Sequence, residues 1–177
     1  MSDFTAFYSL KTTDQAEAVE LLKRANRKGY VFPQTGKWVS FVADANEFKA
    51  DPKVTSFNEG ILLHYTRTDD FFGWGFSIFN GPQCVCQFDI ADFGEGIRIK
   101  DKDFNSESLE LIVDSDKVDR IKEILYPEST EEAYKIKPDY VFAELVGLHP
   151  VEWISWGIVD QHLEDYVDQY GEVITVA

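Results

Sequence analysis

Three short segments between Ile61 and Ile90 constrain the fold most, because large apolar side chains alternate along them with small or polar ones. Side chains point alternately to the two faces of a β-strand, so this period of two predicts three strands, at 61–66, 71–79 and 83–90. The segments between them are short, and short turns join antiparallel neighbours. The sequence therefore predicts an antiparallel meander over 61–90.

The length of the second turn decides which residues meet, because residues paired across an antiparallel ladder share a face. A two-residue turn at Asn80-Gly81 would set three polar residues among the aromatic rings of the preceding strand. A three-residue loop at 80–82 makes the whole face apolar, and we favour it. Its predicted pairs are Phe72 with Ile90, Trp74 with Phe88, Phe76 with Cys86 and Ile78 with Cys84.

Residue parity then divides the meander into two faces of different chemistry. We name one the aromatic face; with a loop at 67–70 it carries Ile61, Leu63, Tyr65, Phe72, Trp74, Phe76 and Ile78. The opposite face, named the glycine face, carries His64, Gly73, Gly75 and Ser77. The aromatic face needs a cover of other elements, whereas the glycine face is the more polar of the two.

Cys84 and Cys86 form a Cys-x-Cys pair, which could hold zinc or act in redox chemistry. Residues i and i+2 of a strand lie about 6.6 Å apart, an awkward separation for a disulfide. A closed zinc site would need two further ligands, and the chain has only three histidines. We favour two buried core thiols on the aromatic face, because free cysteine packs as a small hydrophobe.

A helix is predicted over 12–28, after a first strand at 4–10. Thr12 or Thr13 is a candidate N-cap, and Gly29 suits the position after the last turn. Its apolar stripe makes this helix the predicted cover of the aromatic face. Further helices are predicted from Asp114 or Ser115 to Leu125, from Tyr140 to Leu148, and from a Ser155 cap to Gly171.

These elements predict an α+β fold in which the 61–90 meander forms an antiparallel sheet, the 12–28 helix covers one face, and further helices follow toward the C-terminus. We expect a single domain over 1–177, with 114–177 as a candidate helical subregion. The 177 residues are 44% hydrophobic and 15% aromatic, which is typical of a globular domain.

The N-terminal sequence Met1–Tyr8 shows no basic segment followed by a long apolar run, so no secretory signal is expected. No apolar run reaches the roughly 18 residues of a membrane-spanning helix. With only two cysteines, the chain does not carry a disulfide framework. The expected location is the cytoplasm; the sequence does not predict an oligomeric state.

The charge balance limits the partners. The 17 Lys and Arg residues face 32 Asp and Glu residues, a net charge of −15, which repels phosphate backbones and anionic lipids. We expect no direct binding to nucleic acid or membranes. After Lys137 there are eight acidic residues and no Lys or Arg. Four of them are predicted on one face of the last helix: Asp160, Glu164, Asp165 and Asp168.

This acidic face has two interpretations. It is either an ordinary solvated helix face or a docking surface for a basic partner, whose encounter complementary charge would accelerate. The docking surface is a serious alternative to the solvated face here, because no lysine or arginine neutralises the residues after Lys137.

No motif for a cofactor or metal stands out. Asp101-x-Asp103-x-Asn105 begins like a calcium loop, but Ser106 replaces the turn glycine and Ile112 the bidentate glutamate, so we favour a polar surface loop. Ser77 lies in mid-strand rather than at the sharp turn of a nucleophile elbow. We predict no cofactor, no metal and no assigned catalytic residue.

The glycine face offers the remaining polar site. Glycines let a ligand or another chain segment approach the backbone closely, so His64, Gly73, Gly75 and Ser77 form a candidate ligand face for a small hydrolase or a ligand-binding protein. The structural alternative is a histidine covered by the C-terminal helices, beside glycines that relieve packing against bulky neighbours.

The order of a strand, a helix and the segments 29–31, 36–41 and 73–79 resembles small uncharacterised bacterial cytoplasmic proteins, some of them similar to toxin-immunity proteins. The resemblance covers residues 1–90 and implies a binding role without assigning any residue. The leading hypothesis is a non-enzymatic protein-binding domain, an immunity or inhibitor protein that presents its acidic surface to a basic partner. A DNA mimic and the hydrolase or ligand-binding protein are the alternatives.

Overall fold

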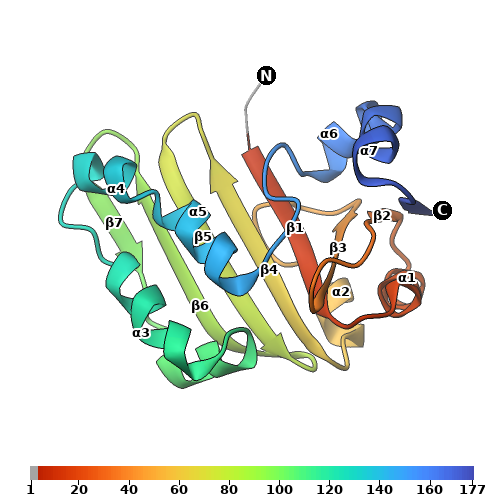
Figure 1. The fold of residues 1–177 in the computed structure, drawn as a ribbon, viewed down its shortest axis with the longest axis horizontal. Helices are drawn as coiled ribbons and strands as arrows, with labels where there is room; N and C mark the ends of the chain where they lie inside the picture. The colour runs from red at the N-terminus through yellow and green to blue at the C-terminus, as the bar shows by residue number, and fades with distance from the viewer. Residues whose placement is uncertain (1–3) are drawn as a thin grey trace.

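The computed structural model describes residues 4–177, and it contains one antiparallel sheet with helices on both faces (Figure 1). The described strands are ordered β7-β6-β5-β4-β1-β3-β2-β8 across the sheet. Their bounds are β1 Phe4–Lys11, β2 Gly29–Val31, β3 Trp38–Ala43, β4 Ile61–Thr68, β5 Phe72–Asn80, β6 Gln83–Asp92, β7 Ile97–Lys100 and β8 Ile174–Val176. The α+β class is therefore as predicted.

The helices follow the strands along the chain and concentrate in its second half. Their bounds are α1 Gln15–Arg24, α2 Pro52–Phe57, α3 Ser115–Ile124, α4 Thr130–Ile136, α5 Pro138–Val146, α6 Trp156–Gln161 and α7 Leu163–Tyr170, with a 3₁₀ helix at Ser106–Leu111. Within residues 4–177, none of them combines the length and the apolar content that crossing a membrane requires.

Strands β4, β5 and β6 form the predicted meander, with the predicted faces but a different register. Phe76 pairs with Phe88, two residues further along β6 than the predicted partner Cys86. A shift of two residues keeps every side chain on its own face, so the aromatic face and the glycine face both form. His64 pairs directly with Ser77 on the glycine face.

The turn between β5 and β6 explains the shift. It contains two residues, Gly81 and Pro82, and Gly81 has a φ of 57°, as the first central position of a type II′ hairpin requires. A β-bulge at Val85 then adds one residue and restores the parity. The bulge turns Cys84 outward, so that only Cys86 is buried and the prediction of two core thiols was wrong for Cys84.

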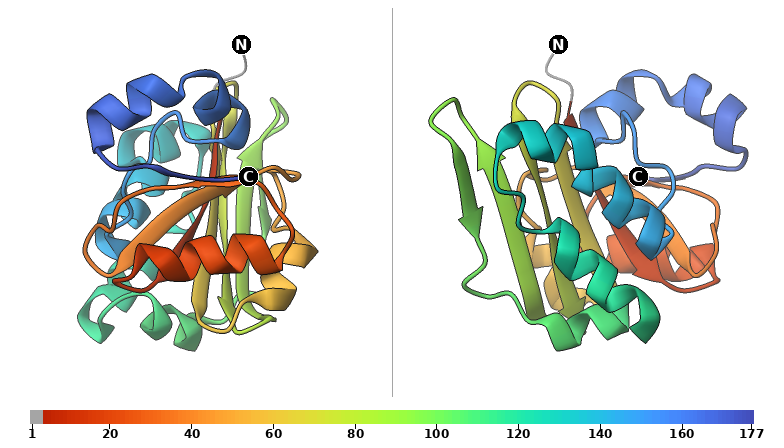
Figure 2. Two further views of the ribbon diagram at one scale, coloured as in Figure 1. Left: turned by 90° about the vertical axis from the view of Figure 1, so that its right-hand side faces the viewer. Right: turned by 60° about the vertical axis from the view of Figure 1, so that its left-hand side comes forward.

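Two hydrophobic cores lie on opposite faces of the sheet. The aromatic face packs under α3 and α5, where the Phe142 ring stacks on Phe76 with 4.4 Å between ring centroids. Helix α1 packs on the other face, where Leu21 and Leu22 join the cluster around Leu62. Figure 2 shows the C-terminal helices on one side of the central strands and α2 on the other.

The prediction that the 12–28 helix covers the aromatic face was therefore wrong. Helix α1 links β1 to β2 by short connections, which hold it against β2, β3 and β8. The aromatic face is left to the helices that follow β7.

The ends of α1 also differ from the prediction. Asp14 is the N-cap, with its carboxylate accepting a hydrogen bond of 2.9 Å from the Ala16 amide. Asn26, with a φ of 51°, takes the left-handed position after the last turn. Gly29 instead begins β2, where a Cβ atom would lie 2.5 Å from the Val42 carbonyl oxygen. A close approach of two backbones, and not a helix end, requires this glycine.

The predicted helix from Ser155 to Gly171 is two helices. Ser155 caps α6 as predicted, accepting a hydrogen bond from the Ile158 amide, but His162 leaves the helical conformation with φ −128° and ψ 31°. The break lets α6 and α7 pack against different residues of the sheet. Trp156 of α6 stacks on Tyr30, and Tyr166 and Tyr170 of α7 contact Phe32 edge-on.

Candidate functional site

The four predicted acidic residues lie on two helices because of the break at His162. Asp160 is on α6, where it accepts a hydrogen bond of 2.6 Å from the Tyr30 hydroxyl; this bond raises the pKa of Tyr30 to about 12. Glu164, Asp165 and Asp168 are on α7, and all three are exposed. The structure thus ties Asp160 to the sheet and leaves the α7 carboxylates in solvent.

Little positive charge faces these carboxylates. Of the described acidic residues beyond Lys137, Asp139 pairs with Arg67 and Asp165 lies beside His162. The second contact is an ion pair only when the histidine is protonated. The separation of Nδ1 and Oδ2 in that second pair is 3.8 Å. In the described chain, no lysine or arginine forms an ion pair with the α7 carboxylates, so their charge is not neutralised by direct pairing.

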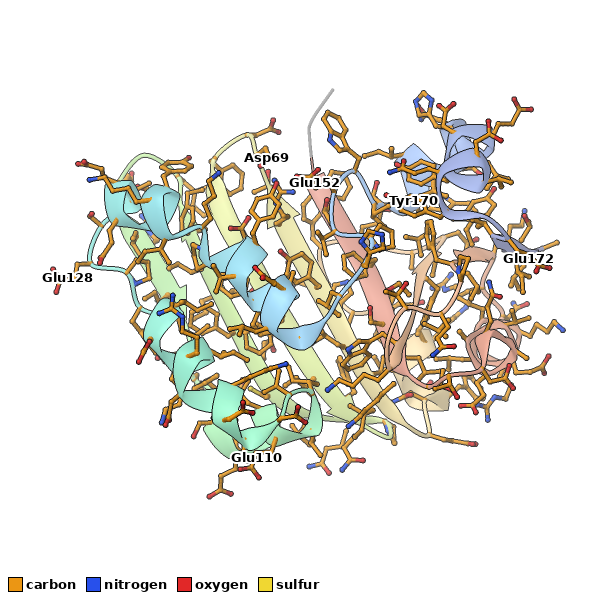
Figure 3. The ribbon with its side chains drawn as sticks, in the orientation of Figure 1. Asp69, Glu110, Glu128, Glu152, Tyr170 and Glu172 are labelled. Atoms are coloured by element: carbon orange, nitrogen blue, oxygen red, sulfur yellow. The ribbon has the colours of Figure 1, made fainter. Side chains whose placement is uncertain are left out.

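Beside these carboxylates, the structure has a hollow that we name the aromatic groove. Its volume is about 370 Å³, and it lies between α7 and the loop that precedes α6. Figure 3 labels Glu152, on the loop before α6, and Tyr170, on α7. The groove is lined by Glu152, Trp153, Ile158, His162, Asp165, Tyr166, Gln169 and Tyr170.

The loop that carries Glu152 and Trp153 is held from several sides. The Tyr166 hydroxyl donates a hydrogen bond to the Trp153 carbonyl oxygen, and the Tyr140 hydroxyl donates one of 2.7 Å to the Glu152 carboxylate. The next residue, Ile154, accepts a hydrogen bond of 2.7 Å from the Ala6 amide of β1. These bonds fix the wall of the groove before any ligand arrives.

Trp153 has two unusual properties for a tryptophan. Its φ is 57°, in the left-handed region that bulky residues rarely occupy, and its side chain is 53% exposed. Strained backbone of this kind persists only where neighbouring groups hold it, and it clusters at functional sites. An exposed aromatic ring in a strained loop therefore marks the groove as a candidate binding site.

The pKa values of Tyr166 and Tyr170 are raised, in part by nearby carboxylates. Burial raises the pKa of Tyr166 to about 12, and the negative charge of Asp165 adds to the shift. Burial also raises the pKa of Tyr170, and here the Glu152 carboxylate adds to it. Both carboxylates thus act on the interior of the groove, which favours a cation over an anion.

Sequence reasoning did not single out Glu152, Trp153 or Tyr170 as site residues. One available signal was the spacing of Tyr166 and Tyr170, since residues four apart share a helix face. Another was a tryptophan next to a glutamate in the short segment after Pro150 and before the Ser155 cap.

The glycine face does not offer His64 to solvent. His64 is 4% exposed, with its ring 4.7 Å from that of Tyr8, and it forms a hydrogen bond with the backbone of Glu47. Burial lowers its pKa to about 4. Its contacts are with Tyr8 of β1 and with the Glu47 backbone in the segment 44–51, and not with the C-terminal helices as the structural alternative assumed. A substrate could reach this histidine only after that segment opened.

The glycines of this face accommodate neighbouring side chains. A Cβ atom at Gly75 would lie 2.2 Å from Oδ1 of Asp89, and one at Gly73 would lie 2.8 Å from the Phe71 ring. Ser77 is half-buried opposite His64. The four residues share one face, as their parity predicts, but the space beside both glycines is filled by this chain.

Arg67 forms a polar cluster within the aromatic face that sequence reasoning missed, because the first hairpin was given a loop at 67–70. Its side chain is 6% exposed, lies 3.1 Å from Asp139, also pairs with Asp69, and stacks on the Tyr140 ring. The parity of Ile61, Leu63 and Tyr65 continues to position 67, and that was the available signal. The guanidinium lies at the wall of a cavity of about 260 Å³.

The remaining candidates have structural roles. Asn105 caps the 3₁₀ helix by accepting a hydrogen bond from the Glu107 amide, and Asp101 accepts one of 3.0 Å from the Tyr126 hydroxyl. Within residues 4–177, no three His, Cys, Asp or Glu side chains come together as a metal site would require. Comparison with protein families, curated proteins and solved structures gave no match to this chain.

Proposed function

We propose that this chain is a non-enzymatic protein-binding domain whose acidic C-terminal surface binds a basic partner, in the manner of an immunity or inhibitor protein. One observation carries the proposal: the exposed carboxylates of Glu164, Asp165 and Asp168 lie on one helix with no lysine or arginine paired to them in the described chain. A surface of this kind attracts cationic partners and speeds their association.

The enzymatic alternative has less support. It depends on His64, which is enclosed by Tyr8 and the segment 44–51 and is held neutral by burial. A general base must come within hydrogen-bond reach of its substrate, and this one is separated from solvent. The acidic surface needs no rearrangement to meet a partner.

The test compares two baits of equal net charge. In the first, Glu164→Gln, Asp165→Asn and Asp168→Asn neutralise α7; in the second, the exposed Glu107, Glu110 and Glu128 are changed to glutamine on the other side of the molecule (Figure 3 labels the last two). Proteins retained by the wild-type chain are identified by mass spectrometry, and each is purified and its affinity measured.

The expected partner is basic, and it is lost by the first bait and kept by the second. Its affinity falls at least about tenfold between about 50 and 300 mM salt, because screening weakens exposed charge pairs. Equal retention by the two baits, a partner that is not basic, or indifference to salt would refute the proposal. Competition by duplex DNA for the same partner would identify the chain as a DNA mimic.

A further inference from the structure

The aromatic groove combines three features that one kind of side chain would satisfy together. Trp153 and Tyr170 are aromatic residues that line the groove, and Ile158 is an apolar one. Glu152 and Asp165 bring carboxylates to the same hollow from two different elements. The groove also has a volume of about 370 Å³, which is enough for one long side chain and the neighbouring backbone.

A cation with a flat, weakly hydrated head fits these features better than other groups. Aromatic faces attract cations, and a guanidinium stacks on them while it donates hydrogen bonds to carboxylates. An apolar side chain would remove water from the Glu152 and Asp165 carboxylates without supplying a positive charge in return, which is costly. An anion would meet Glu152 and Asp165 directly and be repelled.

The groove is formed before binding. The Tyr166 hydroxyl fixes the Trp153 backbone, the Tyr140 hydroxyl holds the Glu152 carboxylate, and β1 holds the Ile154 carbonyl. A pocket already in its bound shape loses little entropy when a side chain enters, so a single inserted residue can dominate an interface.

We propose that the aromatic groove is a pocket for one arginine side chain of the basic partner, which stacks against Trp153 and Tyr170 and pairs with Glu152 and Asp165. This inference rests on the proposed function for the identity of the partner, but the pocket itself can be tested without it. The acidic surface of α7 attracts the partner, and the groove fixes its position.

The probe is the peptide acetyl-Gly-Arg-Gly-amide, titrated into isotopically labelled protein and followed by NMR. The matched probe carries citrulline, which has the same shape as arginine without its charge. We expect saturable shifts of the Trp153 indole N–H and of the α7 amides with the arginine peptide, and at least about fivefold weaker binding of the citrulline peptide.

Two variants separate binding from folding. Trp153→Ala removes one ring and is expected to weaken arginine-peptide binding at least about fivefold; Glu152→Gln should weaken it while a carbonyl oxygen still accepts the bond from Tyr140. Phe93→Ala, at an aromatic residue 64% exposed outside the groove, should leave binding unchanged. Equal binding of the two peptides, or shifts spread over the surface without saturation, would overturn the pocket.

The outcomes also separate the two proposals. A basic, salt-sensitive partner that the Trp153→Ala variant binds as tightly as wild type would refute the arginine pocket and leave the acidic surface standing. Specific arginine-peptide binding in the groove, with no basic partner retained by the wild-type chain, would support the pocket and refute the proposed function.

Discussion

The buried histidine gives the sharpest prediction about stability. His64 is 4% exposed and has a pKa of about 4 in the folded chain, against roughly 6.5 when it is unfolded. Because the folded-state pKa is the lower one, the unfolded chain takes up the proton first. The neutral histidine therefore contributes stability above about pH 6.5 that is lost as the pH falls toward 4.

The magnitude follows from the difference between the two pKa values. At about pH 5, proton linkage predicts that His64 costs the fold roughly 2 kcal/mol relative to pH 7.5. A His64→Gln variant should lack this component, since glutamine does not titrate. The pH dependence of its unfolding free energy should be shallower than that of wild type by that amount, whatever its stability at neutral pH.

The assay is urea unfolding of both proteins between about pH 7.5 and 5, with carboxylates contributing alike to each. The matched control is the same substitution at His162, whose side chain is 49% exposed. If His64→Gln loses stability with falling pH as steeply as wild type, the histidine is not held neutral by burial and the reasoning fails.

Two further predictions concern glycines and thiols. Gly29→Ala should destabilise the fold by roughly 2 kcal/mol or more, because its Cβ would meet a backbone oxygen at 2.5 Å. Gly157→Ala, in helix α6 with nothing within 4 Å of the added Cβ, should stabilise the fold by up to about 1 kcal/mol. Calorimetry that gave both substitutions the same sign would contradict this. In the folded protein at about pH 8, Cys84 should react with a thiol reagent, while Cys86, buried and with a pKa of about 11, should react only in denaturant. Mass spectrometry of the labelled peptides identifies which thiol reacted, and labelling of Cys86 first would disprove the placement of the bulge.

Local patterns were enough for the first strand, for the meander strands and for the starts of α3 and α6. The period of two between Ile61 and Ile90 predicted the meander and its two faces. Both faces survived register errors of four residues between β4 and β5 and of two between β5 and β6, because an even shift does not change parity. Ser155 caps α6 and Asp114 precedes α3 as predicted, since the start of a helix depends on a few adjacent residues.

The cover of each face could not be predicted in the same way. Helix α1 and helices α3 and α5 all carry apolar stripes, so any of them could bury the aromatic face. The connections to β1 and β2 decided the position of α1, and the place of those strands depends on the order of the whole sheet. The bulge at Val85 likewise depends on how two strands fit, and it moved Cys84 to the surface.

The candidate site shows the same division. The excess of acidic residues after Lys137 is visible in the sequence, and so is the lack of basic residues to neutralise it. The aromatic groove is not visible there, because Glu152 and Trp153 lie in a loop while Tyr166 and Tyr170 lie on α7. The hydrogen bond from Tyr166 joins α7 to the loop, and the bond from the Ala6 amide of β1 holds the loop on the sheet.

By itself, the sequence determined the α+β class, the two chemically distinct faces of the meander, and the concentration of negative charge near the C-terminus. Each of these depends on the order and type of nearby residues. The tertiary structure alone decided which helix lies on which face, that His64 is enclosed by the segment 44–51, and that an aromatic groove opens beside the acidic helix. These features depend on contacts between distant segments, whose geometry no local pattern specifies.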